Sequence, residues 1–197
     1  MIPLNIPTCI GKEHLYLDEL LLNRQFFYER NYTRKCNQFF ERMYPGSKAL
    51  LTNSCTQALE LAAIILDLKA GDEVIMPSYT YVSTANAFVL RNVTPVFVDI
   101  RPDTLNIDER LIEQAITPRT KAIVPIDYGG VGCEMQTIRK IADKHGLPIV
   151  EDSAHGVMAK YKGAYLGTHS DICTISFDYM KNISDRKSTR LKLQSQR

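Results

Sequence analysis

The residues best suited to chemistry lie in four short polar segments, each following an apolar run. The first is Ser176-Phe177-Asp178-Tyr179-Met180-Lys181, which comes after Ile172-Cys173-Thr174-Ile175. A lysine next to the end of a core strand can be desolvated enough for its amine to attack a carbonyl carbon and form an imine. Most lysines are solvated surface residues, so Lys181 becomes a candidate only in combination with the other segments.

The second segment, Glu151-Asp152-Ser153-Ala154-His155, follows the apolar run Leu147-Pro148-Ile149-Val150. A carboxylate at the end of a buried strand loses solvation, so it needs a cation or several hydrogen bonds to remain ionised. A protonated pyridine nitrogen would be such a cation. An Asp that caps the next helix explains the same pattern equally well.

The other two segments precede predicted helices. Thr52-Asn53-Ser54-Cys55-Thr56 would present free main-chain N–H groups and hydroxyls to a phosphate, although an ordinary helix cap is the simpler interpretation of this segment alone. In Pro77-Ser78-Tyr79-Thr80-Tyr81 a tyrosine could stack on a planar ring or merely pack. Together the four segments supply a phosphate cradle, a stacking ring, a pyridinium partner and an imine-forming amine, which are the parts that pyridoxal phosphate requires.

The elements that position these segments alternate in type from Ala49 onward. Short apolar runs predict strands at residues 74–76, 95–98, 122–126, 148–150 and 172–177. Apolar positions at helical spacing predict helices around residues 57–68, 111–116 and 135–145. This alternation is typical of an α/β fold, here a three-layer αβα domain with a mostly parallel sheet, in which ligands bind at the carboxyl ends of the strands.

Composition divides the 197 residues into three parts. Residues 1–48 contain two predicted helices and no strand, so we expect an N-terminal helical arm, and residues 49–184 form the predicted α/β domain. Residues 185–197 hold five Lys or Arg and one Asp but few apolar residues, so we expect this tail to be disordered. Since the tail carries +4 and the whole chain +2, residues 1–184 carry −2, which argues against a nucleic-acid surface.

The cysteines and the N-terminus indicate where the protein works. Five scattered cysteines with no Cys-x-x-Cys pair and no cysteine–histidine cluster favour a reducing cytoplasm and no metal site. The first residues lack the basic and apolar regions of a signal peptide, and acidic residues interrupt the most apolar helix candidate. We therefore expect no membrane span.

Longer stretches around the four segments resemble the DegT/DnrJ family of pyridoxal-phosphate-dependent sugar aminotransferases. The similarity runs from Pro3-x-Asn5-x-Pro7 to about Ser184, and it is carried by Ser54-Cys55-Thr56, Pro77-Ser78-Tyr79-Thr80-Tyr81-Val82-Ser83-Thr84-Ala85-Asn86, Glu151-Asp152-Ser153-Ala154-His155 and Ser176-Phe177-x-x-x-Lys181-Asn182. The resemblance implies an incomplete large domain of the type I, aspartate aminotransferase-like fold. It also implies that the full-length form is a homodimer with shared active sites, of which about half of each chain is absent here.

The resemblance assigns the phosphate of the cofactor to Cys55, Thr56 and Ser176, with Ser54 among the cofactor-binding residues. Further roles follow for the remaining candidates. Tyr81 would stack on the ring, Asp152 would pair with the pyridine nitrogen, and His155 would lie near the phenolic oxygen. Lys181 would hold the cofactor as a Schiff base and then move the proton between the substrate carbon and the cofactor.

The activity implied by the resemblance is transamination of a sugar. Glutamate would leave its amino group on the cofactor, and a nucleotide-linked 4-keto-6-deoxyhexose, dTDP-4-dehydro-6-deoxy-D-glucose, would become the 4-amino sugar. A sugar dehydratase of the same family is an alternative, but those relatives carry a histidine in place of the lysine, so Lys181 argues against it. An inactive fragment that self-associates is the third possibility.

Two departures from the family pattern concern the site. Asp178 stands where the family usually has a histidine after Ser-Phe, which puts a carboxylate near the expected phosphate. After Ser184 the family continues with a glycine-rich segment, whereas this chain continues with the basic tail. We expect the tail to be unrelated to the family.

Overall fold

Helices and strands alternate along the part of the chain that the computed structural model describes, which is residues 11–22, 31–178, 180–181 and 190–193. The helices are α1 (Glu13–Leu22), α2 (Asn31–Met43), α3 (Cys55–Ile65), α4 (Val82–Val89), α5 (Glu109–Ile112) and α6 (Met135–His145). Two 3₁₀ turns cover Glu113–Ala115 and Tyr128–Gly130. The strands are β1 (Lys48–Leu50), β2 (Glu73–Pro77), β3 (Thr94–Val98), β4 (Thr120–Ile123), β5 (Val150–Asp152), β6 (Lys160–Tyr161), β7 (Ala164–Tyr165), β8 (Ile172–Ile175) and β9 (Arg190–Leu193).

The central strands of the sheet pair in parallel. β2 pairs in parallel with β3 and β4, and β5 pairs in parallel with β8. Two isolated parallel bridges, Ile123 with Ile149 and Ile126 with Asp152, connect these two groups. β9 lies antiparallel between β8 and β1, and β6 and β7 form a separate antiparallel hairpin. The predicted α/β fold with a mostly parallel sheet is confirmed.

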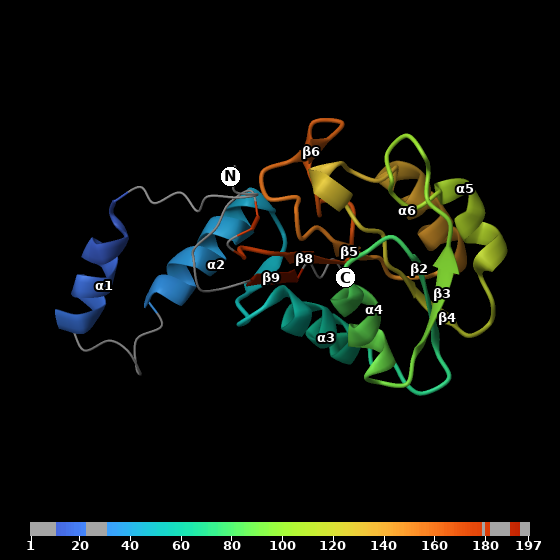
Figure 1. The fold of residues 1–197 in the computed structure, drawn as a ribbon, viewed down its shortest axis with the longest axis horizontal. Coiled ribbons are helices and arrows are strands. Elements are labelled where there is room, and N and C mark those ends of the chain that lie inside the picture. The colour runs from blue at the N-terminus through green and yellow to red at the C-terminus, as the bar shows by residue number, and fades with distance from the viewer. Residues whose placement is uncertain (1–10, 23–30, 179, 182–189, 194–197) are drawn as a thin grey trace, which may run out of the picture.

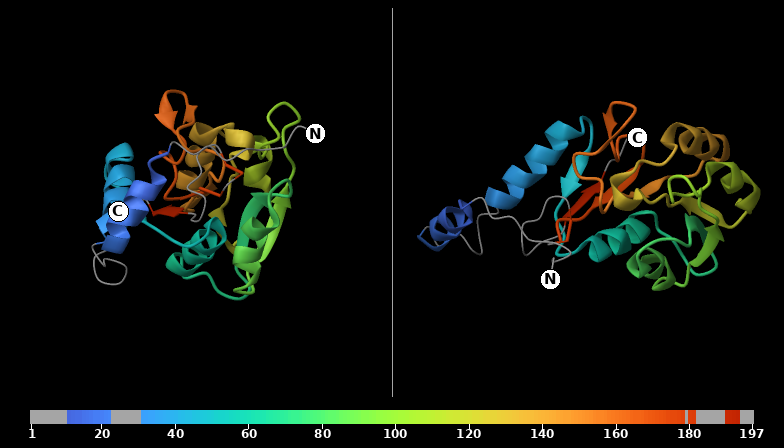
Figure 2. Two further views of the ribbon diagram at one scale, coloured as in Figure 1. Left: turned by 60° about the vertical axis from the view of Figure 1, so that its left-hand side comes forward. Right: turned by 45° about the horizontal axis from the view of Figure 1, so that its top comes forward.

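Helices cover both faces of the sheet, as Figures 1 and 2 show, with α3 and α4 on one face and α5 and α6 on the other. β2 explains why the strands are apolar without interruption. Val74 and Met76 enter the core with α3 and α4, whereas Ile75 enters the core with α5 and α6. Both faces of the strand are buried, so polar and apolar residues do not alternate. Each such side chain contributes roughly 1.5–3 kcal/mol of burial free energy.

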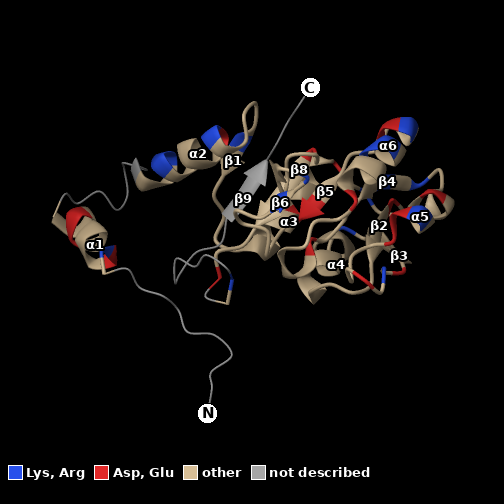
Figure 3. Ribbon diagram, turned by 90° about the horizontal axis from the view of Figure 1, so that it is seen from above, with Lys and Arg blue, Asp and Glu red and all other residues tan. Residues whose placement is uncertain are grey.

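β5 carries the acidic segment inside the strand rather than after it. We predicted a strand at residues 148–150, whereas β5 spans Val150–Asp152, and Figure 3 shows it as a red arrow within the sheet. β8 pairs with both Glu151 and Asp152, and the N–H of Asp152 donates to the carbonyl of Pro125 at 2.9 Å on the other side. Pairing on both edges draws the two acids into the sheet, and apolar patterning alone does not indicate this.

The two N-terminal helices pack differently. Phe40 of α2 and the following Tyr44 are buried with residues of β1 and β8. α1 has no buried residue and stands apart from the sheet in Figure 1. It contacts the next helix through the Tyr32 hydroxyl, which donates to Glu19 at 2.5 Å. The helical arm at residues 1–48 remains a prediction, and β1 crosses its expected end.

Residues 190–193 form β9, which corrects the expectation that the whole tail is disordered. β9 pairs with β8 on one side and with β1 on the other. The order Arg-Leu-Lys-Leu alternates polar and apolar residues with the period of a strand, and two strand edges offer main-chain partners. The other tail residues, the motif Pro3-x-Asn5-x-Pro7, Asn182 and Ser184 lie outside the described residues.

The described ranges lack two kinds of feature. None of the helices there combines the length and the apolar character that crossing a membrane requires. Among the same residues, no group of three or more His, Cys, Asp or Glu side chains is arranged to hold a metal ion.

Candidate active site

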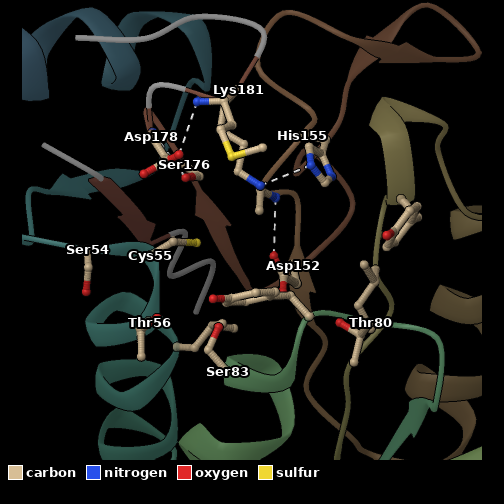
Figure 4. Close-up of a pocket in the computed structure, with 16 residues that line it drawn as sticks. Ser54, Cys55, Thr56, Thr80, Ser83, Asp152, His155, Ser176, Asp178 and Lys181 are labelled. Atoms are coloured by element: carbon tan, nitrogen blue, oxygen red, sulfur yellow. Dashed lines mark hydrogen bonds between the residues drawn. The ribbon is translucent and has the colours of Figure 1, made fainter. Parts of the chain in front are cut away.

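A pocket of about 630 Å³ opens beyond the carboxyl ends of β5 and β8, beside the first turns of α3 and α4 (Figure 4). It is lined by all eight residues that the sequence analysis selected: Ser54, Cys55, Thr56, Tyr81, Asp152, His155, Ser176 and Lys181. The rest of the lining comes from Leu59, Thr80, Ser83, Ile126, Tyr128, Ala154, Asp178 and Met180. Segments far apart in sequence therefore meet around one cavity, as expected at this edge of a parallel sheet.

The first turn of α3 offers unused main-chain donors to the pocket. Ser54 is the N-cap, and its hydroxyl accepts a hydrogen bond from the N–H of Gln57 at 3.1 Å. The first helical hydrogen bond runs from Ala58 to Ser54 at 3.1 Å. Within the described residues, the N–H groups of Cys55 and Thr56 therefore have no acceptor. The segment combines both predicted features, because one serine caps the helix while two amides remain available to an anion.

Asp152 forms the buried floor of the pocket and is only 4% exposed. Its Oδ2 accepts from the Thr84 hydroxyl at 2.7 Å, and its Oδ1 accepts from the N–H of Ala154 at 3.2 Å. Burial raises the pKa of Asp152 above its ordinary value, whereas these hydrogen bonds and the charge of Lys181 lower it. The described residues after β5 form turns rather than a helix, so the helix-cap alternative is wrong.

Lys181 and His155 meet above Asp152. Lys181 Nζ lies 3.0 Å from His155 Nε2, and Figure 4 marks this contact with a dashed line. Burial lowers the pKa of His155, and the charge of Lys181 lowers it further. A neutral imidazole can accept a hydrogen bond at Nε2 from the lysine ammonium group, which fixes the direction of the amine in the pocket.

Tyr81 lines the pocket but is 73% exposed, so little of the protein restrains its ring. The other tyrosine of the same segment, Tyr79, packs against Tyr128 with the ring centroids 4.4 Å apart. Tyr128 in turn contacts the His155 ring at 5.7 Å. Of the two candidate stacking residues, only Tyr81 lines the pocket, and Tyr79 is committed to an aromatic cluster.

Ser176 and Asp178 shape the turn that leads from β8 to Lys181. The Ser176 hydroxyl accepts from the N–H of Asp178 at 3.3 Å, and the Asp178 carboxylate accepts from the N–H of Met180 at 3.1 Å. The N–H of Lys181 donates to the Asp178 carbonyl at 2.9 Å. Asp178 is exposed and its carboxylate is engaged by this turn, so it supports the main chain before Lys181 as well as lining the pocket.

The sequence analysis missed several polar groups of the site. Thr80, Ser83 and Tyr128 line the pocket, and the fully buried Thr84 bonds to Asp152. Thr80 lies just before α4 and Thr84 four residues later in its first turn, and their hydroxyls are hydrogen-bonded at 2.9 Å. That spacing, next to a strand end with a carboxyl group, was the available signal.

Comparison with known proteins identifies the family of the chain. The sequence profile of the DegT/DnrJ/EryC1/StrS aminotransferase family matches residues 8–185. The chain belongs to this family. The chain is also similar to the spore coat polysaccharide biosynthesis protein SpsC of Bacillus subtilis, which is 38% identical over 183 residues, 93% of this chain and 47% of SpsC. The putative L-glutamine:3-amino-2,3-dideoxy-scyllo-inosose aminotransferase of Streptomyces kanamyceticus is 47% identical over 132 residues, 67% of this chain and 32% of that protein.

Solved structures of sugar aminotransferases share the fold. The putative sugar aminotransferase Spr1654 from Streptococcus pneumoniae, in its PMP form, superposes with a TM-score of 0.91 at 28% identity, covering 100% of this chain and 53% of that chain. The same protein in its PLP form gives the same values. The type I fold expected for this family member is therefore confirmed. The chain spans about half the length of SpsC and of Spr1654.

Proposed function

We propose that this family member is the cofactor-binding part of a pyridoxal-phosphate-dependent aminotransferase that moves the amino group of glutamate to a nucleotide-linked 4-keto-6-deoxyhexose. The observation that carries the proposal is the meeting of the Lys181 amine and the buried Asp152 carboxyl in one pocket. Unused amides at the start of α3 border the same pocket.

The residues around the pocket fit the cofactor. The N–H groups of Cys55 and Thr56 suit its phosphate, and the Ser176 hydroxyl lines the same space. The Asp152 carboxyl, whose pKa is raised by burial, suits a protonated ring nitrogen because a cation would restore the ionised form. When bound, the cofactor supplies an electron-withdrawing ring that stabilises negative charge on the substrate carbon.

The residues of the chain divide the work between them. Asp152 holds a positive charge at the floor of the pocket. His155 Nε2 accepts from Lys181 Nζ and orients the amine. Lys181 Nζ binds the cofactor and then carries a proton to and from the substrate carbon, because it is the amine that lines the pocket among the described residues.

The sugar is proposed from similarity. Residues 71–80 and 101–109 resemble the corresponding stretches of dTDP-4-amino-4,6-dideoxygalactose transaminases, which suggests dTDP-4-dehydro-6-deoxy-D-glucose as the acceptor. Arg101 binds Asp103 and Glu109, and within the described chain residues 101–109 do not line the pocket. The proposed setting is a cytoplasmic homodimer whose two chains complete each other's sites.

A single-turnover assay tests the proposal. The purified 197-residue chain is loaded with pyridoxal phosphate and mixed with L-glutamate, and 2-oxoglutarate is measured. We expect about one 2-oxoglutarate per bound cofactor and a rate at least about 100-fold lower in Lys181→Ala. L-glutamine is tested in parallel as a donor. The aminated protein is then mixed with dTDP-4-dehydro-6-deoxy-D-glucose, and the 4-amino sugar is identified by mass spectrometry.

Lys140→Ala is the matched control, because Lys140 is exposed on α6 and does not line the pocket. It should behave like the unaltered chain. Failure of the chain to bind the cofactor contradicts the proposal. So does a Lys181→Ala variant that forms 2-oxoglutarate as fast as the unaltered chain.

A further inference from the structure

A row of two hydroxyl groups ends on the buried carboxyl of Asp152. The Thr84 hydroxyl donates to Asp152 Oδ2 at 2.7 Å, and the Thr80 hydroxyl donates to Thr84 Oγ1 at 2.9 Å. Thr84 is fully buried, whereas Thr80 is partly exposed and lines the pocket. The row therefore runs from the pocket wall to the group at its floor.

The chemistry of the members fixes the direction of this row. An ionised carboxylate accepts hydrogen bonds and cannot donate, so Thr84 must direct its one hydroxyl proton toward Asp152. The Thr84 oxygen is then free to accept from Thr80. A hydrogen bond to a charged acceptor is stronger than a neutral one, and successive bonds polarise each other. Both hydroxyls therefore favour the charged form of Asp152.

The row also links two elements. Thr84 lies in the first turn of α4, where its N–H donates to the carbonyl of Tyr81 at 3.0 Å. Tyr81 is the N-cap and makes no side-chain cap hydrogen bond. The Thr84 hydroxyl is thus engaged with Asp152 of β5 rather than with capping, and it holds the start of α4 against the carboxyl group.

We propose that Thr84, supported by Thr80, is a positioning residue that fixes the orientation of the Asp152 carboxyl and keeps it charged for a cationic ring nitrogen in the pocket. The identity of that ring rests on the proposed function, whereas the link between Thr84 and Asp152 does not. Without the Thr84 hydroxyl, Oδ2 loses its donor in a buried site, which favours the protonated carboxyl.

Other groups around Asp152 also change the pKa of its carboxyl. Lys181, after β8, lowers the pKa of Asp152 through its charge, and the nearby Thr174 of β8 lowers it as well. Cys55 of α3 also faces the carboxyl, and burial followed by the charge of Asp152 raises the pKa of its thiol. The bond from Thr84 is the largest of the effects that lower the pKa of Asp152. Its loss should therefore be measurable.

The first experiment needs no cofactor. Aspartate carboxyl carbons are labelled with ¹³C in the cofactor-free chain, and the Asp152 signal, assigned by its loss in Asp152→Asn, is followed against pH. Thr84→Val keeps the shape of the side chain and removes the hydroxyl, so the midpoint should rise. Thr84→Ser keeps the hydroxyl, so the midpoint should stay near that of the unaltered chain.

The second experiment measures the dissociation constant of pyridoxal phosphate for the same variants. Thr84→Val should weaken binding about tenfold or more, since it removes a hydrogen bond to a charged group. Thr84→Ser should remain within about threefold of the unaltered chain. Thr137→Val, an exposed threonine on α6, is the matched control and should have no effect.

Several results overturn the inference. One is a folded Thr84→Val chain with an unchanged Asp152 midpoint, and another is a Thr84→Ser chain as impaired as Thr84→Val. If Thr84→Val does not fold, Thr80→Val should raise the midpoint by a smaller amount, and an unchanged midpoint there overturns the inference. If the unaltered chain does not bind the cofactor but Thr84→Val still shifts the midpoint, the proposed function fails while the positioning role stands.

Discussion

Glu151 and Asp152 are neighbours in β5 and, because side chains alternate along a strand, they face opposite sides of the sheet. Asp152 lines the pocket and accepts hydrogen bonds from Thr84 and Ala154. Glu151 is fully buried on the other side, where its Oε1 accepts from the N–H of Gly167 at 2.6 Å. One strand end thus carries two carboxyl groups in different surroundings.

Glu151 lies near a second acid, Asp127, on the side of the sheet away from the pocket, which we call the sealed side. Asp127 is 1% exposed, and its Oδ1 accepts from the N–H of Cys133 at 3.2 Å. Burial, followed by the charge of Glu151, raises the pKa of Asp127 well above its ordinary value. Protonation of Asp127 is therefore favoured on this side of the sheet. The carboxyl of Asp152, by contrast, is left for a cation that enters the pocket.

Replacing the carboxyl of Asp152, which lines the pocket, should have the largest effect on activity. Asp152→Asn cannot hold a ring nitrogen in its protonated form, so cofactor-dependent formation of 2-oxoglutarate should fall on the order of 100-fold or more. The free energy of unfolding should stay equal or rise, because a buried carboxyl disappears. Single-turnover kinetics and urea unfolding measure the two effects. An Asp152→Asn chain that keeps full activity would remove the distinction between the two carboxyl groups.

Replacing the sealed carboxyl should affect stability instead. The folded-state pKa of Asp127 lies above its unfolded value, so the folded chain loses stability as the pH rises from the ordinary carboxyl range through the raised pKa. Asp127→Asn supplies a neutral group with an N–H donor for Glu151. The free energy of unfolding of Asp127→Asn should match that of the unaltered chain at about pH 4. At pH values above the raised pKa of Asp127 it should be higher by about 1 kcal/mol or more.

Urea unfolding at several pH values checks this prediction, with Asp18→Asn on the exposed face of α1 as the matched control. Cofactor affinity should change less than about threefold in Asp127→Asn, because Asp127 does not line the pocket. A stability gain that is equal at every pH contradicts the assignment of a proton to this pair.

The contact between His155 and Lys181 lies on the pocket side of β5 and makes cofactor binding depend on pH. Because the folded-state pKa of His155 is lowered, the imidazole stays neutral until the pH falls below its ordinary range, and protonation then removes the acceptor for Lys181. Cofactor affinity should therefore fall several-fold below about pH 6. His155→Gln carries an acceptor that does not titrate and should flatten this acid limb. Comparing the two curves cancels the titration of the cofactor phosphate, and identical acid limbs contradict the assigned role.

The smallest expected effect concerns the helix cap at the edge of the pocket. Ser54→Ala removes the bond to Gln57 and should lower the free energy of unfolding by about 1 kcal/mol. Ser83→Ala, at a pocket serine that does not cap a helix, is the matched control. Thermal unfolding measures both. A larger loss of stability in Ser83→Ala would mean that Ser54 does not cap α3.

The sequence predicts the parts of the site that depend on chain order. Strands buried on both faces have continuous apolar runs, so the positions of Ser176 and Lys181 after β8 could be predicted. The start of α3 at Ser54 could be predicted as well, since capping chemistry is local in sequence. The sequence also predicts the correct edge of the sheet for Asp152, although this residue lies within β5 and not after it.

Contacts between distant segments could not be predicted in the same way. Thr84 reaches Asp152 across 68 positions, and the pairing of Asp127 with Glu151 depends on the register between neighbouring strands. Neither contact has a local pattern. β9 is a different case, because its alternation is visible in the sequence but its stability depends on two strand edges that exist only in the fold.

Borohydride trapping tests the central claim, that Lys181 is the amine that binds the cofactor in this pocket. The full chain is mixed with less than one equivalent of pyridoxal phosphate, reduced with sodium borohydride, digested and examined by mass spectrometry. The account predicts that the phosphopyridoxyl label is found on Lys181 and is lost in Lys181→Ala but kept in Lys140→Ala. A label spread over surface lysines, or unchanged in Lys181→Ala, contradicts it.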